Sequence, residues 1–550
     1  MQLSDRRASS LRRGGERPRA DLVIRGGTVV DGTGSAPVLA DVAITGGRII
    51  DVGAAAWKQG EPCLDASGLL VAPGFIDIHS HSDFTLTVDP RAVSSIAQGV
   101  TLEVVGNCGH GCAPIGDPET AKANVYGYCE DHPISWSTVA EYLACLEARQ
   151  PAVNVLTLVP NGNLRLAVAA SLERPSSPEE LLQMKRLLAR GMEEGAYGFS
   201  TGLEYGPELA CSEEEVGELC RVAAGAGGLY ATHTRNRPGE AGETIAEAIR
   251  TATLAEVPLQ ISHISVVARL SADGGQAVAQ AIEQVDRARE RGIDAGFDMH
   301  TRLFGTTNLS AVLPPWALAG GKEQIASRLA DGGIRQELKQ HQSIVTALAR
   351  DDWSRIVLTD CRSDPASAHR DVAEIAASRG GREPLDVVYD ILLDEIDDLH
   401  LPMIMAFCYR EEDIRPAFDH PDCMVGSDAT ALAPDGPLAG ATFHGAYTWA
   451  AWFYRHFVRD VAAFRPEEAV RRLTSLPARR LGLSDRGVIR QGACADLAIF
   501  DPETFGERGT TIEPNRTADG MVHVVVNGKV TLRGGKLTGE RGGHVLRRGG

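Results

Sequence analysis

The stretch GFIDIHSHSDF, residues 74–84, places two histidines one residue apart at the end of an apolar run. This pattern is typical of a β-strand, in which residues i and i+2 point to the same face of the sheet. We therefore expect His79 and His81 to reach one point in space, with Asp77 and Asp83 close by. The pair is either two ordinary surface histidines or the first half of a metal site, and the rest of the chain must decide.

The middle of the chain alternates apolar, strand-like runs with helical patterns such as SPEELLQMKRLLARGMEEG, which is typical of βαβ units and a parallel sheet. The strand-like runs lie at residues 69–81, 99–108, 153–163, 195–203, 228–235, 258–265, 294–300 and 423–428. Eight such units predict an α/β fold, a (β/α)8 TIM barrel, whose chemistry lies at the C-terminal ends of the strands.

The two ends of the chain have a different pattern. Residues 21–68 and 485–550 contain short alternating runs separated by glycine-bearing turns, which predict one small β-sandwich domain built from both ends around a barrel at 69–484. The long gap before the last strand predicts a helical insertion at about 301–350, on the catalytic face, as a candidate lid. Residues 1–20 are basic without an apolar core, so we expect a disordered tail rather than a secretory signal.

Composition excludes several classes of function. The net charge of -18 argues against a nucleic-acid surface, because phosphate binding needs clustered cations. No apolar run is long enough for a membrane helix, so we expect no membrane partner. The 11 cysteines are scattered without a disulfide-type spacing, which favours a reducing cytoplasm. We expect a small-molecule partner, and the architecture is also compatible with a homo-oligomer.

Metal-ligand residue types recur at the ends of the predicted strands. They are His79, His81, Cys108, His233, His263 and Asp428. Histidine, thiolate and carboxylate form the zinc ligand set, and a thiolate favours zinc over magnesium or calcium. Each residue alone is weak evidence for a metal site, because a single strand histidine or a buried cysteine is more often structural. Their shared position at the ends of five strands predicts a metal site.

Several motifs make the chain resemble the amidohydrolase superfamily, and within it the N-acyl-D-amino-acid deacylases, or D-aminoacylases. APGFIDIHSHSD occurs across the superfamily, whereas GNCG at 106–109, GFSTGLEY at 198–205 and LPPWALAGG at 313–321 are narrower. The resemblance covers nearly the whole chain from residue 21. It implies a zinc-dependent hydrolase of a non-peptide C–N bond, and most specifically the deacylation of an N-acyl-D-amino acid by metal-activated water.

The resemblance also implies how the ligands divide. One tightly bound zinc would be held by His233, His263 and Cys108. A second, weaker position would be held by His79, His81 and Asp428.

Three residues receive further roles from the same resemblance. Cys108 would bridge the two metal positions, as a carboxylated lysine does in most binuclear members of the superfamily. Glu204 is the alternative bridge, or a substrate contact. Asp428 would be the catalytic base that takes a proton from water and returns it to the leaving amine.

The residues expected to contact the substrate depart from the motifs of the N-acyl-D-amino-acid deacylases. Ser265 stands where a lysine is usual, DMHTR at 298–302 replaces a tyrosine-proline-tyrosine run, and GPLAG at 436–440 lacks an expected arginine. We therefore expect conserved chemistry on a changed substrate, with an arginine elsewhere as the fork for a carboxylate. The expected substrate contacts are Glu204, Arg235, Ser265, His300 and Arg302.

Two alternatives stay open. The same metal site could hydrolyse a cyclic amide, a carbamate or a ureide, and a neutral pocket would favour this option over an N-acyl amino acid. The chain could also be a non-catalytic scaffold relative, although such proteins typically lose metal ligands and all six are present here.

Overall fold

The computed structural model describes most of the chain. The described residues are 19–54, 58, 60–129, 131–235, 241–264, 274–399 and 401–549. The predicted tail therefore lies outside the described residues except for Arg19 and Ala20, and Ala20 is buried. Among the described residues, no helix is both long and apolar enough to cross a membrane.

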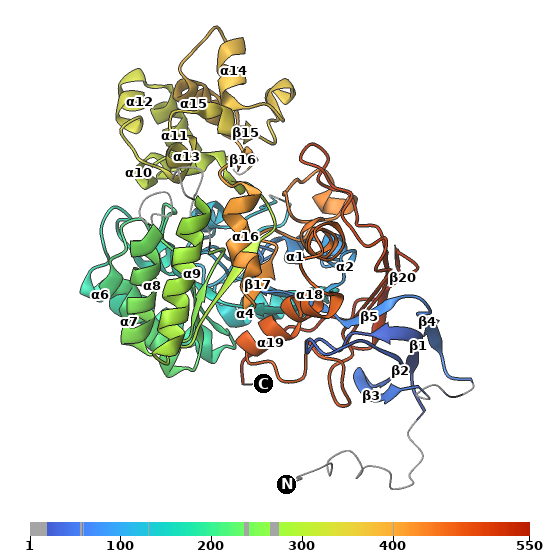
Figure 1. Ribbon diagram of the computed structural model, residues 1–550. Helices are drawn as coiled ribbons and strands as arrows, with labels where there is room; N and C mark the ends of the chain where they lie inside the picture. The colour runs from blue at the N-terminus through green and yellow to red at the C-terminus, as the bar shows by residue number, and fades with distance from the viewer. Residues whose placement is uncertain are drawn as a thin grey trace.

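Both ends of the chain contribute strands to one nine-stranded sheet, seen in blue and red in Figure 1. Its N-terminal strands are β1 (Leu22–Val29), β2 (Val38–Thr45), β3 (Arg48–Gly53), β4 (Cys63–Asp65) and β5 (Leu70–Pro73). Its C-terminal strands are β18 (Leu497–Phe500), β19 (Met521–Val526), β20 (Lys529–Arg533) and β21 (Lys536–Leu537). The two sets meet where β5 and β18 pair antiparallel. Alternate apolar side chains, among them Ile24, Val42 and Leu497, form a core of their own under this sheet.

Parallel strands fill the middle of the chain. One sheet contains β6 (Phe75–Asp77), β7 (Val100–Val105) and β8 (Asn154–Thr157). A second contains β9 (Val159–Pro160), β10 (Gly198–Gly202), β11 (Leu229–His233), β12 (Leu259–Ile261), β13 (Ala295–His300) and β17 (Cys423–Gly426). Each of the eight predicted runs thus contains a strand, and every pairing in these two sheets is parallel.

The two parallel sheets are linked at both edges. Only Leu158 separates β8 from β9. At the other edge, the chain after β17 bonds to the chain after β6: Asp428 N donates to His79 O at 2.8 Å, and His81 N donates to Ala429 O at 2.8 Å. These hydrogen bonds therefore join the outer edges of the two parallel sheets just past the ends of β6 and β17.

Helices between these strands begin at strong local signals. A capping box formed by Thr138 and Glu141 starts α4 (Val139–Arg149), and one formed by Ser177 and Glu180 starts α6 (Pro178–Glu193). The neighbouring helices are α7 (Glu213–Gly225), α8 (Ala241–Ala255), α9 (Gly274–Glu290), α16 (Glu411–Asp419), α18 (Pro466–Leu473) and α19 (Ser475–Arg480). Helices α6 to α9 lie side by side over the parallel strands (Figure 1). The short helices are α1 (Thr85–Val88), α2 (Val93–Ile96), α3 (Pro118–Ala121), α5 (Asn161–Val168) and α17 (Trp449–Tyr454).

The chain from β14 to β16 builds a separate lobe, yellow in Figure 1. Its three-stranded antiparallel sheet contains β14 (Gly305–Asn308), β15 (Ile356–Leu358) and β16 (Met403–Ala406). Its helices are α10 (Pro315–Leu318), α11 (Lys322–Ala330), α12 (Gly332–Leu338), α13 (Ile344–Ala349), α14 (Val372–Ser378) and α15 (Pro384–Asp394). The elements of the lobe continue past residue 350 because β16, at its far end, is the central strand that β14 and β15 need as a partner.

Candidate metal centre

The six strand-end residues named from the sequence come together where the parallel strands end. His233 is the last residue of β11, and the others lie in the first residues after their strands: His79 and His81 after β6, Cys108 after β7, His263 after β12 and Asp428 after β17. The four histidines and Cys108 are almost completely buried.

The two histidines of the opening motif meet for a different reason from the one that the strand pattern suggested. Strand β6 ends at Asp77, so His79 and His81 lie beyond it, in a loop. The hydrogen bonds from this loop to the chain after β17 hold the segment in place, and the two rings lie 5.5 Å apart. Asp77 supports the same junction, because its Oδ1 accepts hydrogen bonds from the backbone N–H groups of His79 and Ser427.

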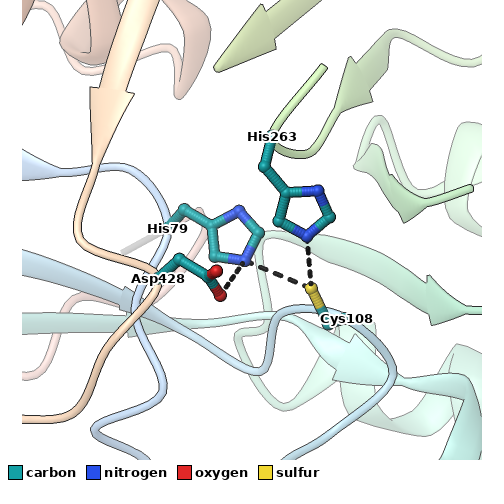
Figure 2. Close-up of side chains that lie close together, drawn as sticks. All are labelled: His79, Cys108, His263 and Asp428. Atoms are coloured by element: carbon teal, nitrogen blue, oxygen red, sulfur yellow. Dashed lines mark hydrogen bonds and ion pairs between the residues drawn. The ribbon is translucent and has the colours of Figure 1, made fainter. Parts of the chain in front are cut away.

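Four side chains form a compact group of metal-type donors (Figure 2). One donor atom from each of His79, Cys108, His263 and Asp428 lies within 4.8 Å of all the others. Cys108 Sγ is 3.2 Å from His79 Nε2 and 3.4 Å from His263 Nε2. Asp428 Oδ1 is 3.6 Å from His79 Nε2. We call these four residues the donor cluster.

The backbone of the donor cluster is strained. Cys108, His263 and Asp428 have φ angles of 53°, 33° and 45°, in the left-handed region that residues with a side chain rarely adopt. Each such residue costs on the order of 1–3 kcal/mol, and such strain is concentrated at functional sites. The turn after each strand therefore aims its side chain at the cluster at the expense of local stability.

His81 and His233 flank the donor cluster on either side. His81 Nε2 lies 3.2 Å from Asp428 Oδ1. His233 Nε2 lies 2.9 Å from Glu204 Oε2, and its ring is 4.7 Å from that of His263. All six predicted ligands are thus neighbours, but the four that lie closest together combine members of both expected metal positions.

The electrostatics of the cluster favour a thiolate and a carboxylate. Burial alone would raise the pKa of Cys108, but the positive charges of His79 and His263 hold it well below its usual value. Burial likewise opposes ionisation of Asp428, whereas its hydrogen bond with His81 and the charge of Arg302 hold its pKa well below the usual range. Both shifts favour the form of each group that can bind a cation.

Arg302 contacts the donor cluster through Asp428. One terminal nitrogen of its guanidinium donates to Asp428 Oδ2 at 3.0 Å and to Asp428 O at 2.8 Å. The other donates to Ser427 O at 3.0 Å and to His444 O. These bonds use both terminal nitrogens, so the buried guanidinium offers no terminal pair to a substrate carboxylate.

The other expected substrate contacts lie in different surroundings. His300 is buried, and its Nδ1 accepts a hydrogen bond from the backbone N–H of Arg302 at 3.3 Å. Arg235 bonds to the Glu247 carboxylate at 3.2 Å and to Cys211 O at 2.8 Å, neither of which belongs to the donor cluster. Ser265 lies outside the described residues.

Comparison with known proteins agrees with this arrangement. Residues 63–532 match the amidohydrolase family over most of the chain. The chain belongs to the amidohydrolase family. This amidohydrolase is 33% identical to an N-acyl-D-glutamate deacylase of Alcaligenes xylosoxydans xylosoxydans, over 96% of this chain and 97% of that protein.

Two solved structures are also similar to this amidohydrolase. A D-aminoacylase studied for the role of its binuclear metal centre is 30% identical, with a TM-score of 0.80 over 96% of this chain and 100% of that one. The N-acyl-D-glutamate deacylase of Bordetella bronchiseptica, in complex with zinc and a phosphonate that mimics the tetrahedral intermediate, is 29% identical. Its TM-score is 0.78, over 96% of this chain and 100% of that one. The donor cluster therefore lies in a chain whose structural neighbours carry metal.

Asp298 is a site residue that the sequence reasoning did not single out. Its Oδ1 lies 3.2 Å from His79 Nδ1 and accepts a hydrogen bond from His263 N at 2.8 Å, while Oδ2 accepts one from Gln260 at 2.7 Å. Asp298 thus fixes two members of the donor cluster from behind. A carboxylate in the middle of an otherwise apolar strand was the signal that could have identified it, because a buried charge needs partners.

A group of aromatic side chains adjoins the histidines. The ring of Tyr126 is 4.9 Å from that of His81, and the ring of Tyr205 is 4.7 Å from that of His233. His110 lies between the two tyrosines, 5.2 Å from Tyr126 and 4.6 Å from Tyr205. Their scattered positions in the sequence gave no common pattern by which to find them.

Proposed function

We propose that this amidohydrolase is a zinc enzyme that removes the acyl group from an N-acyl-D-amino acid or a related N-acyl compound. The observation that carries the proposal is the donor cluster of His79, Cys108, His263 and Asp428, with donor atoms within 4.8 Å of one another. It lies in a chain that is 33% identical over 530 residues to an N-acyl-D-glutamate deacylase.

The chemistry of the donors fits zinc. A buried thiolate with imidazole nitrogens is a set that zinc prefers, and the carboxylate of Asp428 completes it. Cys108, His233 and His263 would hold one ion, and His79, His81 and Asp428 a second position. Cys108 lies close enough to both groups to bridge them. When bound, zinc supplies a Lewis acid that polarises the amide carbonyl and acidifies water.

Asp428 has the geometry of a proton carrier. Its Oδ1 faces His79 and His81, whereas Oδ2 is held by Arg302. The guanidinium thereby fixes the carboxylate and leaves Oδ1 on the side of the cluster. Asp428 would take a proton from the attacking water and deliver it to the leaving amine.

For the architecture, we propose a (β/α)8 barrel at 69–484 with an insertion that begins near residue 301, and a β-sandwich from 21–68 and 485–550. The support for the barrel is the parallel pairing throughout the two sheets β6–β8 and β9–β13 with β17, and the hydrogen bonds that join the segments after β6 and β17. We also propose a cytoplasmic location, supported by the 11 cysteines, none of which forms a disulfide.

A second candidate is hydrolysis of a cyclic amide, a carbamate or a ureide at the same site. The observation that favours it is the engagement of Arg302 with Asp428 and of Arg235 with Glu247. Neither arginine, as the structure places it, is available to a substrate carboxylate. A substrate without a carboxylate needs no such partner.

Metal content and amine release together test the proposal. The protein is purified without added metal, its zinc is measured by elemental analysis, and amine release is followed for a panel of N-acyl-D- and N-acyl-L-amino acids. Stoichiometric zinc with D-selective release is expected. Zinc without release, together with turnover of a hydantoin or carbamate, would favour the second candidate. A protein that binds no zinc after reconstitution would contradict both.

A further inference from the structure

Glu204 and His233 form a buried carboxylate–histidine contact at the edge of the donor cluster, and the proposed function gives no role to Glu204. Glu204 Oε2 lies 2.9 Å from His233 Nε2, and the two side chains are 6% and 1% exposed. The backbone brings them together: β10 and β11 pair Gly202 with His233, and Leu203 N then donates to His233 O at 3.1 Å. The contact is therefore built into the register of two neighbouring strands.

The other nitrogen of the same ring has unmet bonding capacity. Within the part of the chain that the structure describes, His233 Nδ1 is buried without a hydrogen-bond partner. A buried polar atom without a partner costs roughly 1–3 kcal/mol and calls for an explanation. The ring lies 4.7 Å from that of His263, a member of the donor cluster. Cys108 also interacts with His233, so a cation bound by Cys108 is the partner that we infer for Nδ1.

His79 has the same arrangement with the two nitrogens exchanged. Its Nδ1 lies 3.2 Å from the Asp298 carboxylate, while its Nε2 faces Cys108 Sγ at 3.2 Å. A neutral imidazole carries its proton on one nitrogen and a lone pair on the other, and a carboxylate that accepts the N–H decides which. Asp298 therefore leaves Nε2 of His79 available to a metal, and Glu204 leaves Nδ1 of His233 available.

We propose that Glu204 is a positioning residue that holds the His233 proton on Nε2, so that the Nδ1 lone pair binds the zinc beside Cys108. The proposal rests on the proposed function, because it takes His233 as a zinc ligand. It assigns Glu204 neither as a bridge between metal ions nor as a substrate contact. Carboxylates that orient a metal-binding histidine in this way typically contribute about 10–100-fold to metal affinity.

Two substitutions separate these three roles. Glu204→Ala removes the acceptor for His233 Nε2–H, whereas Glu204→Gln keeps an acceptor oxygen but removes the charge. Zinc content and the zinc Kd, measured by competition with a chromogenic chelator, are the main readouts, and kcat and KM are the second. Glu213→Gln serves as the control, because Glu213 is partly exposed on α7 and pairs with Arg250 away from the donor cluster.

A positioning role predicts that Glu204→Ala raises the zinc Kd by about 10–100-fold, and that Glu204→Gln restores much of the loss. Equal, severe zinc loss in both variants would identify a bridging ligand instead, since an amide oxygen replaces a carboxylate poorly there. Zinc binding equal to wild type in both variants, with a raised KM, would identify a substrate contact. Either result overturns the role assigned to Glu204 while wild-type zinc binding still supports the proposed function. A wild-type protein that binds no zinc overturns the proposed function and this role with it.

Thermal unfolding of the metal-free proteins shows whether the variants fold. Metal-free Glu204→Ala is expected to unfold within a few degrees of metal-free wild type, so that its zinc loss is local to the site. If Glu204→Ala does not fold, Glu204→Gln carries the test. A modest rise in the zinc Kd of Glu204→Gln with KM unchanged supports positioning. Severe zinc loss, or wild-type zinc affinity with a raised KM, overturns it.

Discussion

The loops that follow the parallel strands and the nine-stranded sheet differ in what they bury. The loops bury histidines, a cysteine and carboxylates, and three residues of the donor cluster have left-handed backbones. The nine-stranded sheet buries aliphatic side chains such as Ile24, Val42 and Leu497, and its strand pairs are antiparallel except β1–β4 and β1–β5. Regular structure thus supplies stability in one region, and departures from it position reactive groups in the other.

The difference has a physical cause. Aliphatic burial gains roughly 25 cal/mol per Å² and needs no particular partner. A buried charge or imidazole is costly unless another group pairs with it. Asp428 meets this need through His81 and Arg302, and His79 through Asp298 and Cys108. Substitutions in the loops should therefore affect chemistry first, and substitutions in the sheet should affect stability first.

The largest effect is expected at Asp428. Asp428→Asn keeps the size of the side chain but removes its ability to take a proton, so kcat should fall by about 10²–10⁴-fold with most zinc retained. Steady-state kinetics and elemental analysis check this. Asp435→Asn is the control, because Asp435 is an exposed residue a few positions along the same loop. Full activity of Asp428→Asn would exclude it as the base.

The next effect concerns zinc content. Cys108→Ala removes the sulfur that lies between His79 and His263, so zinc content after purification should fall from stoichiometric to a small fraction. Cys112→Ala is the matched control, since Cys112 is also buried and lies four residues away but is not in the donor cluster. Unchanged zinc in Cys108→Ala would move the bridging role to another residue, with Glu204 the first to test.

The nine-stranded sheet should respond in the opposite way. Leu497→Ala, in β18, removes a fully buried side chain and should lower the free energy of unfolding by about 2–5 kcal/mol. The kcat per folded, zinc-loaded molecule should not change. Leu39→Ala, in β2 of the same sheet, makes the same substitution at a side chain that is 74% exposed and should cost less than about 0.5 kcal/mol. A large drop in kcat for Leu497→Ala would contradict the expectation that substitutions in the sheet affect stability before chemistry.

The smallest effect is a pH dependence of stability in the loops. Burial raises the pKa of Glu208 from 4.5 to about 8, against hydrogen bonds from Asn161 and Gly202 N. Between these two pH values the folded protein keeps a proton that the unfolded chain releases, so the contribution of Glu208 to stability falls as pH rises. Glu208→Gln is neutral at every pH, and Asn161, whose Oδ1 lacks a described partner, can turn its amide to accept from it.

Thermal unfolding at pH 5 and pH 8 measures this contribution. The melting temperature of Glu208→Gln relative to wild type should be higher at pH 8 than at pH 5. The same difference at both pH values would mean that Glu208 is ionised in the folded protein. Leu39→Ala, which changes no titratable group, should show no such trend.

Much of the fold could be predicted because its signals are local. The eight strand runs follow from short apolar stretches, and the starts of α4 and α6 follow from capping boxes within three residues. The extent of the lobe could not be predicted from the sequence. Strand β16 pairs with β14 from almost a hundred residues away, and no local sequence pattern indicates a pairing over that separation.

In the candidate site, too, local features could be predicted from the sequence and long-range contacts could not. Residue type and strand position are both local properties, and they were enough to predict the strand-end positions of His79, His81, Cys108, His233, His263 and Asp428. The residues that hold these side chains in place could be found only from the packing of distant segments. Asp298 meets His79 across 219 residues of sequence, and Arg302 meets Asp428 across 126. Glu204 and His233 meet through the register of two strands. These contacts depend on how distant segments pack, and no sequence period or spacing records that packing.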